Sequence, residues 1–316
     1  MNYRTIAQLA GLIDRHLGAI PATVDLVVGI PRSGLLAANM IALKLNLPLT
    51  DLQSFLDDRP VRCGSTRATA RALIDSAHKA RHVLVVDDSV WRGASIAAAR
   101  QQIAAAGIDA KLTYCAAFVA PGVEHVVDLA FESVPFPRVF EWNVMHHPML
   151  GTCCVDIDGI LCRDPLHEEN DDGERYRGFL TGVGAQLLPS FRIGHLVTSR
   201  LEKYRAETEG WLKSVGIEYG ALHMLNVADA ATRRRLGLHG SFKASVYRRL
   251  AESPLFIESE PRQAEEICRL ADKPVLCLTE QRMYQPGMSV ARVARRTGRL
   301  LDRIGRKVGL AGRFTG

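Results

Sequence analysis

Residues 83–95, VLVVDDSVWRGAS, decide how the first half of the chain folds. Four apolar residues precede the paired acids Asp87 and Asp88, and a short stretch then leads through Gly93 to a helical pattern at 95–106. This order is typical of a buried strand, a tight loop and a helix in a parallel α/β sheet. Because ligands of such sheets bind at the carboxyl ends of strands, we expect the two acids to lie at a binding site.

The same alternation continues along the chain of 316 residues, a length that suits about two domains. Further strands are expected at 26–30, 111–119, 153–155, 193–197, 255–257 and 275–278. The pattern restarts after a proline-punctuated segment, so we place a boundary near Leu150. The sequence therefore predicts two Rossmann-like α/β domains with parallel sheets, at 1–150 and 151–284, and a tail at 285–316.

Two loops of the first domain have the composition of anion-binding turns. One is Arg32-Ser33-Gly34, which follows a strand and opens a helix. The other consists of the residues that follow the paired acids, namely Ser89, Val90, Trp91, Arg92, Gly93, Ala94 and Ser95. Backbone N–H groups at a helix N-terminus bind phosphate well, and carboxylates accept hydroxyl groups of a sugar. A plain strand-end turn with a helix cap at Ser89 or Ser95 is the structural alternative.

These loops resemble those of the type I phosphoribosyltransferase family, whose hallmark is an apolar strand, two acids, a short loop, Gly and then Ser or Thr. The resemblance covers roughly residues 20–135. It implies that Asp87 and Asp88 bind the ribose of phosphoribosyl pyrophosphate and that residues 89–95 hold its 5-phosphate. It also implies that residues 32–34 contact the pyrophosphate and that Mg²⁺ accompanies the donor.

Two positions depart from the family pattern. Arg92 stands where a Thr usually precedes the Gly, and Trp91 stands where members that act on purines carry an Asp. An indole cannot accept a proton, so we interpret Trp91 as a sign that the acceptor is not a nucleobase. Residues 52–71 occupy the place of the family's mobile lid, with a plain solvated loop as the alternative. His146 and His147 are candidates for activating an acceptor hydroxyl, or form a packed pair.

A second pair of acids, Asp156 and Asp158, follows the predicted strand 153–155 and precedes Gly159. Side chains two residues apart share one face of a strand, which suits a nucleophile and an acid/base. The candidate partners follow in order along the chain. Thr198 is expected to donate a hydroxyl hydrogen bond to the phosphate, Lys243 to neutralise charge, and Glu258 and Glu260 to act as acids near a metal. Oxygen ligands predict Mg²⁺, with Asp156, Asp158, Glu258 and Glu260 as its candidate ligands.

This set resembles the haloacid dehalogenase-like phosphatase superfamily over roughly residues 151–280. The resemblance implies catalysis by Asp156, Asp158, Lys243 and Thr198. In the superfamily Asp is the usual residue where Glu258 and Glu260 stand, and an inactive relic domain is the alternative. The acidic segment 161–180 is expected to be a solvated cap loop.

The net charge of +6 comes from the tail, since residues 289–316 hold eight Lys and Arg against Asp302 alone. Apolar and basic residues separate onto opposite arcs of a helix there, which predicts a basic amphipathic helix for an anionic membrane surface. A helix packed on the domains is the alternative. The stripe lacks interleaved aromatic residues, so no nucleic acid is expected as a partner, and an RNA binder is the weaker hypothesis.

Together these patterns predict a cytoplasmic, peripherally membrane-bound bifunctional enzyme, resembling systems that install ribofuranose in bacterial surface polysaccharides. It would transfer 5-phosphoribosyl from phosphoribosyl pyrophosphate to a lipid-linked glycan hydroxyl and then remove the 5-phosphate. The cysteine pattern predicts neither zinc binding nor disulfides, and no signal peptide is expected. Two alternatives stay open: a nucleotide salvage or turnover enzyme, and a donor-sensing module that controls the phosphatase.

Overall fold

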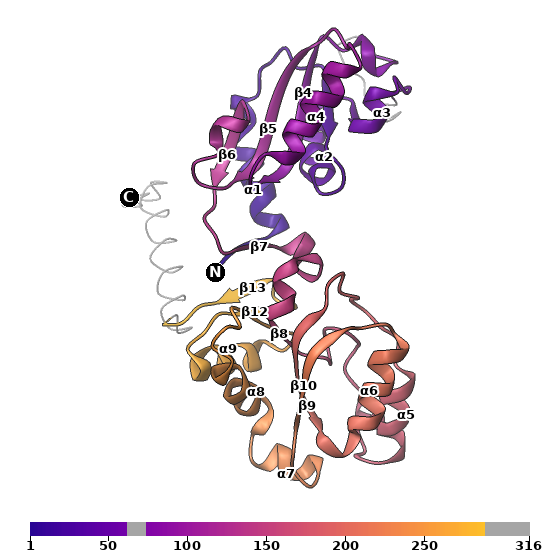
Figure 1. Ribbon diagram of the computed structural model, residues 1–316, viewed down its shortest axis with the longest axis vertical. Coiled ribbons are helices and arrows are strands. Elements are labelled where there is room, and N and C mark those ends of the chain that lie inside the picture. Colours follow the sequence, from indigo (N-terminus) through magenta and orange to yellow (C-terminus); the bar gives the residue numbers. More distant parts are fainter. Residues whose placement is uncertain (62–73, 288–316) are drawn as a thin grey trace, which may run out of the picture. The chain divides into compact units, whose positions relative to one another are not determined.

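The computed structural model describes residues 1–61 and 74–287 (Figure 1). The chain divides into two compact units, here called the N-terminal unit (Asn2–Val144) and the C-terminal unit (Met1 with Met145–Gly316). The division falls a few residues before Leu150. Each unit carries its own parallel sheet.

The N-terminal unit is built on a parallel five-stranded sheet of order β3-β2-β4-β5-β6, beside a parallel pair β1-β7. Its strands are β1 (Asn2–Arg4), β2 (Leu26–Gly29), β3 (Leu49–Asp51), β4 (His82–Val90), β5 (Lys111–Val119), β6 (Leu129–Ser133) and β7 (Arg138–Phe140). Its helices are α1 (Ile6–His16), α2 (Gly34–Leu45), α3 (Leu52–Leu56) and α4 (Ala94–Ala105), and the 3₁₀ helix η4 (Glu141–His146) follows β7.

Both faces of this sheet are covered, which explains why β4 is a continuous apolar run rather than an alternating one. Leu84 and Val86 pack into one core with residues of α1 and α2, such as Leu9. Val83 and Val85 pack into the other core with residues of α3 and α4. The central strand β4 is therefore buried from His82 to Asp88, and it delivers its last residues to the carboxyl edge of the sheet.

The C-terminal unit has a six-stranded sheet of order β10-β9-β8-β11-β12-β13, parallel except for β13. Its strands are β8 (Cys154–Val155), β9 (Ile193–Leu201), β10 (Tyr219–Leu225), β11 (Phe256–Glu258), β12 (Val275–Cys277) and β13 (Arg282–Tyr284). Its helices are α5 (Glu174–Gly182), α6 (Arg205–Ser214), α7 (Ala230–Arg235), α8 (Leu238–Arg249) and α9 (Pro261–Ala271). Helices α8 and α9 pack on one face, where Ala244, Tyr247 and Ile267 join the core.

Two expectations about loops need correction. β4 does not end at Val86, because Ser89 and Val90 pair with β5 and belong to the strand. The turn between β4 and α4 is therefore shorter than the predicted loop 89–95, and Ala94 and Ser95 already lie in α4. The acidic segment 161–180 is more than a solvated loop, since it contains most of α5 and an ion pair between Arg163 and Glu169.

Some expectations fall on residues that the structure does not describe. The lid expected at 52–71 is described as far as Val61, and the basic tail as far as Gly287. The amphipathic helix predicted for the tail lies outside the described residues. Among the residues that are described, no helix combines the length and the apolar character that crossing a membrane requires.

Candidate active sites

Asp87 and Asp88 lie near the carboxyl end of β4, and both are buried. The Oδ1 atom of Asp87 accepts a hydrogen bond of 2.9 Å from the N–H of Asp88. Burial, followed by the neighbouring charge of Asp88, raises the pKa of Asp87 to about 8. Two carboxyl groups held this close at a sheet edge are costly without a ligand, which marks them as a binding-site candidate.

The turn at Arg32, Ser33 and Gly34 lies directly against Asp87. A Cβ atom on Gly34 would stand 2.8 Å from the carbonyl oxygen of Val86 and 3.1 Å from the Cα of Asp87. Strands β2 and β4 are parallel neighbours in the sheet, so the turn between β2 and α2 lies next to the end of β4. Arg32 is exposed, and the Pro31–Arg32 peptide bond is cis.

Trp142 is a residue of this site that the sequence did not reveal. It lies on η4, and its indole Nε1–H donates a hydrogen bond of 2.7 Å to Oδ2 of Asp88. Its ring stacks on Phe140, with the ring centroids 5.1 Å apart. The indole therefore fixes the orientation of one of the two acids. No local pattern pointed to this role. Trp142 follows β7, which belongs to the separate strand pair β1-β7, and is distant in sequence from the acids at the end of β4.

The turn after β4 presents an exposed aromatic pair. The side chain of Trp91 is 57% exposed, and its ring centroid lies 5.5 Å from that of Phe136. The guanidinium of Arg92 lies over the Trp91 ring, 4.4 Å from its centroid. Helix α4 begins at Ala94, and the N-cap residue before it is Gly93 with φ of 82°. The helix has no side-chain cap, so neither Ser89 nor Ser95 caps it.

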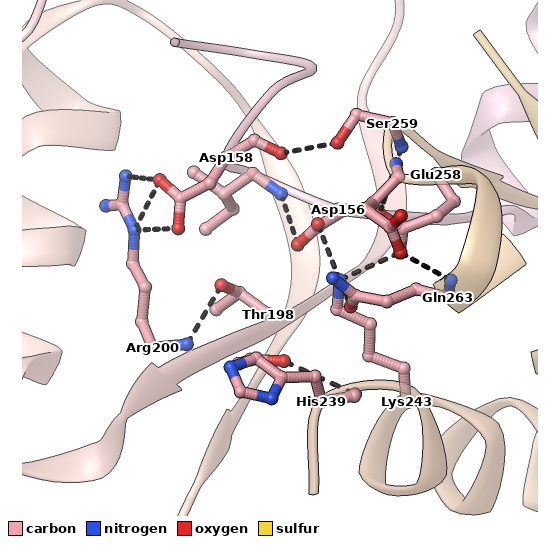
Figure 2. Close-up of polar contacts among 12 residues, drawn as sticks. Asp156, Asp158, Thr198, Arg200, His239, Lys243, Glu258, Ser259 and Gln263 are labelled. Carbon is pink, nitrogen blue, oxygen red and sulfur yellow. Dashed lines mark hydrogen bonds and ion pairs between the residues drawn. The ribbon is translucent and has the colours of Figure 1, made fainter. Parts of the chain in front are cut away.

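The second site lies at the carboxyl end of β8, and Figure 2 shows its side chains. The Nζ of Lys243 on α8 lies 2.6 Å from Oδ2 of Asp156 and 2.8 Å from Oε2 of Glu258. All three side chains are buried. Burial alone would lower the pKa of Lys243, but the two carboxylates raise it above its usual value, so the lysine stays charged. Burial raises the pKa of Asp156, and Lys243 opposes this.

The carboxylate of Asp158 points away from Lys243 and forms an ion pair with Arg200 (Figure 2). The guanidinium Nη2 lies 2.6 Å from Oδ1, and Nε lies 3.1 Å from Oδ2. Arg200 ends the segment Val197-Thr-Ser-Arg200 in β9 and is completely buried. Its role was not predicted, although it lies two residues after the candidate Thr198. A bidentate contact of this kind fixes the orientation of the carboxylate.

A cavity of about 270 Å³ joins these groups in the C-terminal unit. Asp156, Asp158, Thr198, Lys243 and Glu260 are among its lining residues. So is Asp164, a carboxylate that the sequence analysis missed. Burial, and then the charges of Asp158 and Glu258, raise the pKa of Asp164. The cavity thus combines the predicted nucleophile, the predicted acid/base and the predicted hydroxyl donor.

The four residues predicted to bind Mg²⁺ are engaged with other groups. Glu258 is completely buried, and its Oε1 accepts the N–H groups of Ser259 and Glu260. Glu260 caps α9 by accepting the N–H of Gln263. In the described part of the chain no three His, Cys, Asp or Glu side chains are arranged to hold a metal ion. As they are arranged here, the four residues do not form a preformed magnesium site, and their role as its ligands stays a prediction.

His146 and His147 have partners within the C-terminal unit. The Nδ1 of His146 lies 2.6 Å from the hydroxyl of Ser190, and Nδ1 of His147 accepts the N–H of Met149. Burial lowers the pKa of His147. Activation of an acceptor by either histidine stays a prediction.

Residues 2–147 match the family model of the phosphoribosyl transferase domain. The described N-terminal unit is thus a phosphoribosyltransferase domain, which confirms this part of the resemblance. The match covers under half of the chain and leaves the C-terminal unit outside it. No curated protein matches the chain.

Solved structures similar to the chain include phosphoribosyltransferases from several organisms. A xanthine-guanine-hypoxanthine phosphoribosyltransferase of Helicobacter pylori shares 15% identity, with 45% of this chain and 95% of that chain covered and a TM-score of 0.34. The orotate phosphoribosyltransferase of Aeropyrum pernix shares 23% identity, with 40% and 71% covered and a TM-score of 0.29. An adenine phosphoribosyltransferase of Trypanosoma brucei shares 15% identity, with 41% and 64% covered and a TM-score of 0.27.

Proposed function

We propose that the chain transfers a 5-phosphoribosyl group from phosphoribosyl pyrophosphate to a glycan hydroxyl and then removes the 5-phosphate. The net product is a ribofuranosyl residue of a surface polysaccharide. The phosphoribosyltransferase domain at residues 2–147 supports the first step. The observation that carries the second step is the 2.6 Å contact between Lys243 and Asp156 in a cavity that Asp158 and Thr198 also line.

In the first step the acceptor oxygen attacks C1 of the ribose while the bond from C1 to the pyrophosphate oxygen breaks. Pyrophosphate leaves with the bonding electrons, and the acceptor proton passes to a base or to water. Asp87 and Asp88 would accept the ribose hydroxyls, and the turn at residues 32–34 would hold the pyrophosphate by its N–H groups. Binding of these hydroxyls gives a reason for burying two adjacent carboxyl groups at the sheet edge.

A sugar acceptor is supported by the exposed ring of Trp91 and its neighbour Phe136. Aromatic faces next to a reaction centre pack well against the apolar face of a sugar ring. An indole offers no base for a nucleobase nitrogen. The proposed acceptor is a lipid-linked glycan. The basic residues of the tail at 289–316 would bring the enzyme to an anionic membrane surface, and the sequence pattern of the tail supports this membrane contact.

In the second step an Asp156 oxygen would attack phosphorus, and the bond from phosphorus to the ribose O5 would break. Asp158 would give a proton to O5, and later take one from the water that cleaves the aspartyl-phosphate to inorganic phosphate. Lys243 orients Asp156 for the attack. We propose Mg²⁺ as a companion of the phosphorylated ligands of both units.

Mass spectrometry of acceptor products tests both steps. Wild type with phosphoribosyl pyrophosphate and a glycan acceptor should add a pentosyl group, and Asp156→Asn should add a phosphopentosyl group instead. Asp156→Asn should still release pyrophosphate, which makes the first step its internal control. Asp88→Asn should lose pyrophosphate release while it still hydrolyses phosphomonoesters.

Other results would contradict the proposal. Transfer to nucleobases rather than to glycans would favour a nucleotide salvage enzyme. Donor binding without any pyrophosphate release would favour a sensor that controls the phosphatase. Equal phosphate release by wild type and Asp156→Asn would remove the second step.

A further inference from the structure

Lys243 has no N–H group left for a substrate. An ammonium group has three N–H donors. Those of Lys243 meet Oδ2 of Asp156 at 2.6 Å, Oε2 of Glu258 at 2.8 Å and Oε1 of Gln263 at 2.9 Å. Figure 2 shows these partners around the ammonium group. The lysine is therefore committed to the nucleophile and its neighbours, and a dianionic phosphate needs another cation in the cavity.

Arg233 on α7 is a buried cation that lines the same cavity. It is 8% exposed, and its Nη1 donates a hydrogen bond of 2.7 Å to the carbonyl oxygen of Ser199, next to Thr198. Its Nε is buried and finds no hydrogen-bond partner among the described residues. Such a donor is costly to bury unless a ligand or solvent meets the group.

Within the described part of the C-terminal unit, the charges around Arg233 differ from those around the other buried cations, Arg200 and Lys243. Arg200 and Lys243 each pair with a carboxylate. Within residues 1–61 and 74–287, by contrast, no carboxylate forms an ion pair with Arg233. Burial, and then the charges of Arg233 and Lys243, lower the pKa of the neighbouring His239 to about 4. That histidine is neutral near pH 7, so the unpaired positive charge at the cavity belongs to Arg233.

The helix that carries Arg233 is held in place by other side chains. Asp229 caps α7 through the N–H of Thr232. Asp172, in the acidic segment, accepts the N–H of Ala230 at 2.9 Å and also meets Lys203 at 2.9 Å. A cation that is positioned so firmly without a carboxylate partner is poised for an anionic ligand.

We propose that Arg233 binds the phosphoryl oxygens of a phosphomonoester in this cavity, while Lys243 only orients Asp156. The inference rests on the phosphatase step proposed above. The Ser199 carbonyl holds one arm of the guanidinium, and the remaining N–H groups suit the tetrahedral oxygens of a phosphate. Because a lysine lacks this fork, Arg233→Lys should restore only part of the binding.

The test compares the full chain with Arg233→Gln, Arg233→Lys and a matched control, Arg234→Gln. Arg234 is the next residue of α7 and is exposed. The measurements are calorimetric binding of inorganic phosphate and steady-state hydrolysis of p-nitrophenyl phosphate. Loss of a charged hydrogen-bonding partner should raise the Kd for phosphate and the KM by about 10- to 100-fold in Arg233→Gln, with a smaller change in kcat. Arg234→Gln should match wild type.

The outcomes separate the inference from the proposed function. If Arg233→Gln and Arg233→Lys keep the wild-type Kd and KM while Asp156→Asn is inactive, the inference is wrong and the phosphatase stands. If wild type hydrolyses no phosphomonoester but loses phosphate binding on Arg233→Gln, the cavity binds phosphate without the proposed catalysis. If wild type binds no phosphate, the inference fails outright. Equal melting temperatures of the two folded glutamine variants exclude a purely structural effect.

Discussion

Trp142 donates its indole N–H to Oδ2 of Asp88 at 2.7 Å, although 54 residues separate them in the chain. The indole fixes one of the two carboxyl groups to which we assign the ribose hydroxyls. A residue outside the sheet motif thus takes part in shaping the first site.

Trp142→Phe should keep the aromatic packing on Phe140 and lose the hydrogen bond to Asp88. A freed carboxyl group binds a ribose less well, so we expect the KM for phosphoribosyl pyrophosphate to rise about 3- to 10-fold. Pyrophosphate release measures this. Trp211→Phe is the matched control, because its indole donates a hydrogen bond of 2.7 Å to Val183 in the other unit. An equal effect of both variants on KM would refute a role for Trp142 at Asp88.

Asp87→Asn should stabilise the protein in a pH-dependent way. The pKa of Asp87 is raised to about 8, so the folded state favours the protonated form. The cost of ionising it grows as pH rises from about 4 towards 8, and the wild type loses stability over that window. The amide keeps the acceptor for the Asp88 N–H and carries no charge. We expect the melting temperature of Asp87→Asn to exceed that of wild type by a few degrees at pH 8, with no difference at pH 4.

Thermal melts across this pH range, without ligand, provide the measurement. Asp109→Asn serves as the control, since Asp109 is exposed. A gain for Asp87→Asn that is the same at pH 4 and pH 8 would mean that the ionisation of Asp87 is not its source.

Gly34→Ala should damage the first site. The new Cβ would stand 2.8 Å from the Val86 carbonyl oxygen and 3.1 Å from the Asp87 Cα, both of which are rigid backbone atoms. The turn must move away from β4, so we expect a loss of about 1–3 kcal/mol of stability and at least a 10-fold weaker binding of phosphoribosyl pyrophosphate. Gly18→Ala is the control, because nothing lies within 4 Å of its added Cβ. Unchanged donor binding in Gly34→Ala would show that this turn takes no part in the site.

Arg200→Lys should slow the second step by disturbing Asp158. Lysine keeps the charge but cannot make the bidentate contact that orients the carboxylate. We expect kcat for phosphomonoester hydrolysis to fall about 10-fold or more, with KM nearly unchanged, because the contact acts on the acid/base rather than on phosphate binding. Arg205→Lys is the control, since Arg205 pairs with Glu202 and Glu209 and does not line the cavity. A change in KM alone would place Arg200 in substrate binding instead.

The strand pattern was predictable because it depends on local periodicity and apolar runs. The strand expected at 111–119 has those bounds in the structure, and helix α2 begins at Gly34, in the turn that was expected to open a helix. Prediction failed where pairing across the sheet decides the end of a strand. Ser89 and Val90 look like loop residues in sequence, yet hydrogen bonds to β5 extend β4 through them.

By itself the sequence determined the alternation of strands and helices, and with it the placement of Asp87 and Asp156 near the carboxyl ends of central strands. Side-chain periodicity along each element is local, so the order of the residues is enough to indicate it. Only the tertiary structure decided that Trp142 meets Asp88, that Arg200 pairs with Asp158 and that Arg233 stays without a carboxylate partner in the described chain. These contacts depend on strand order and on where distant turns come together, and neither leaves a periodic signal in the chain.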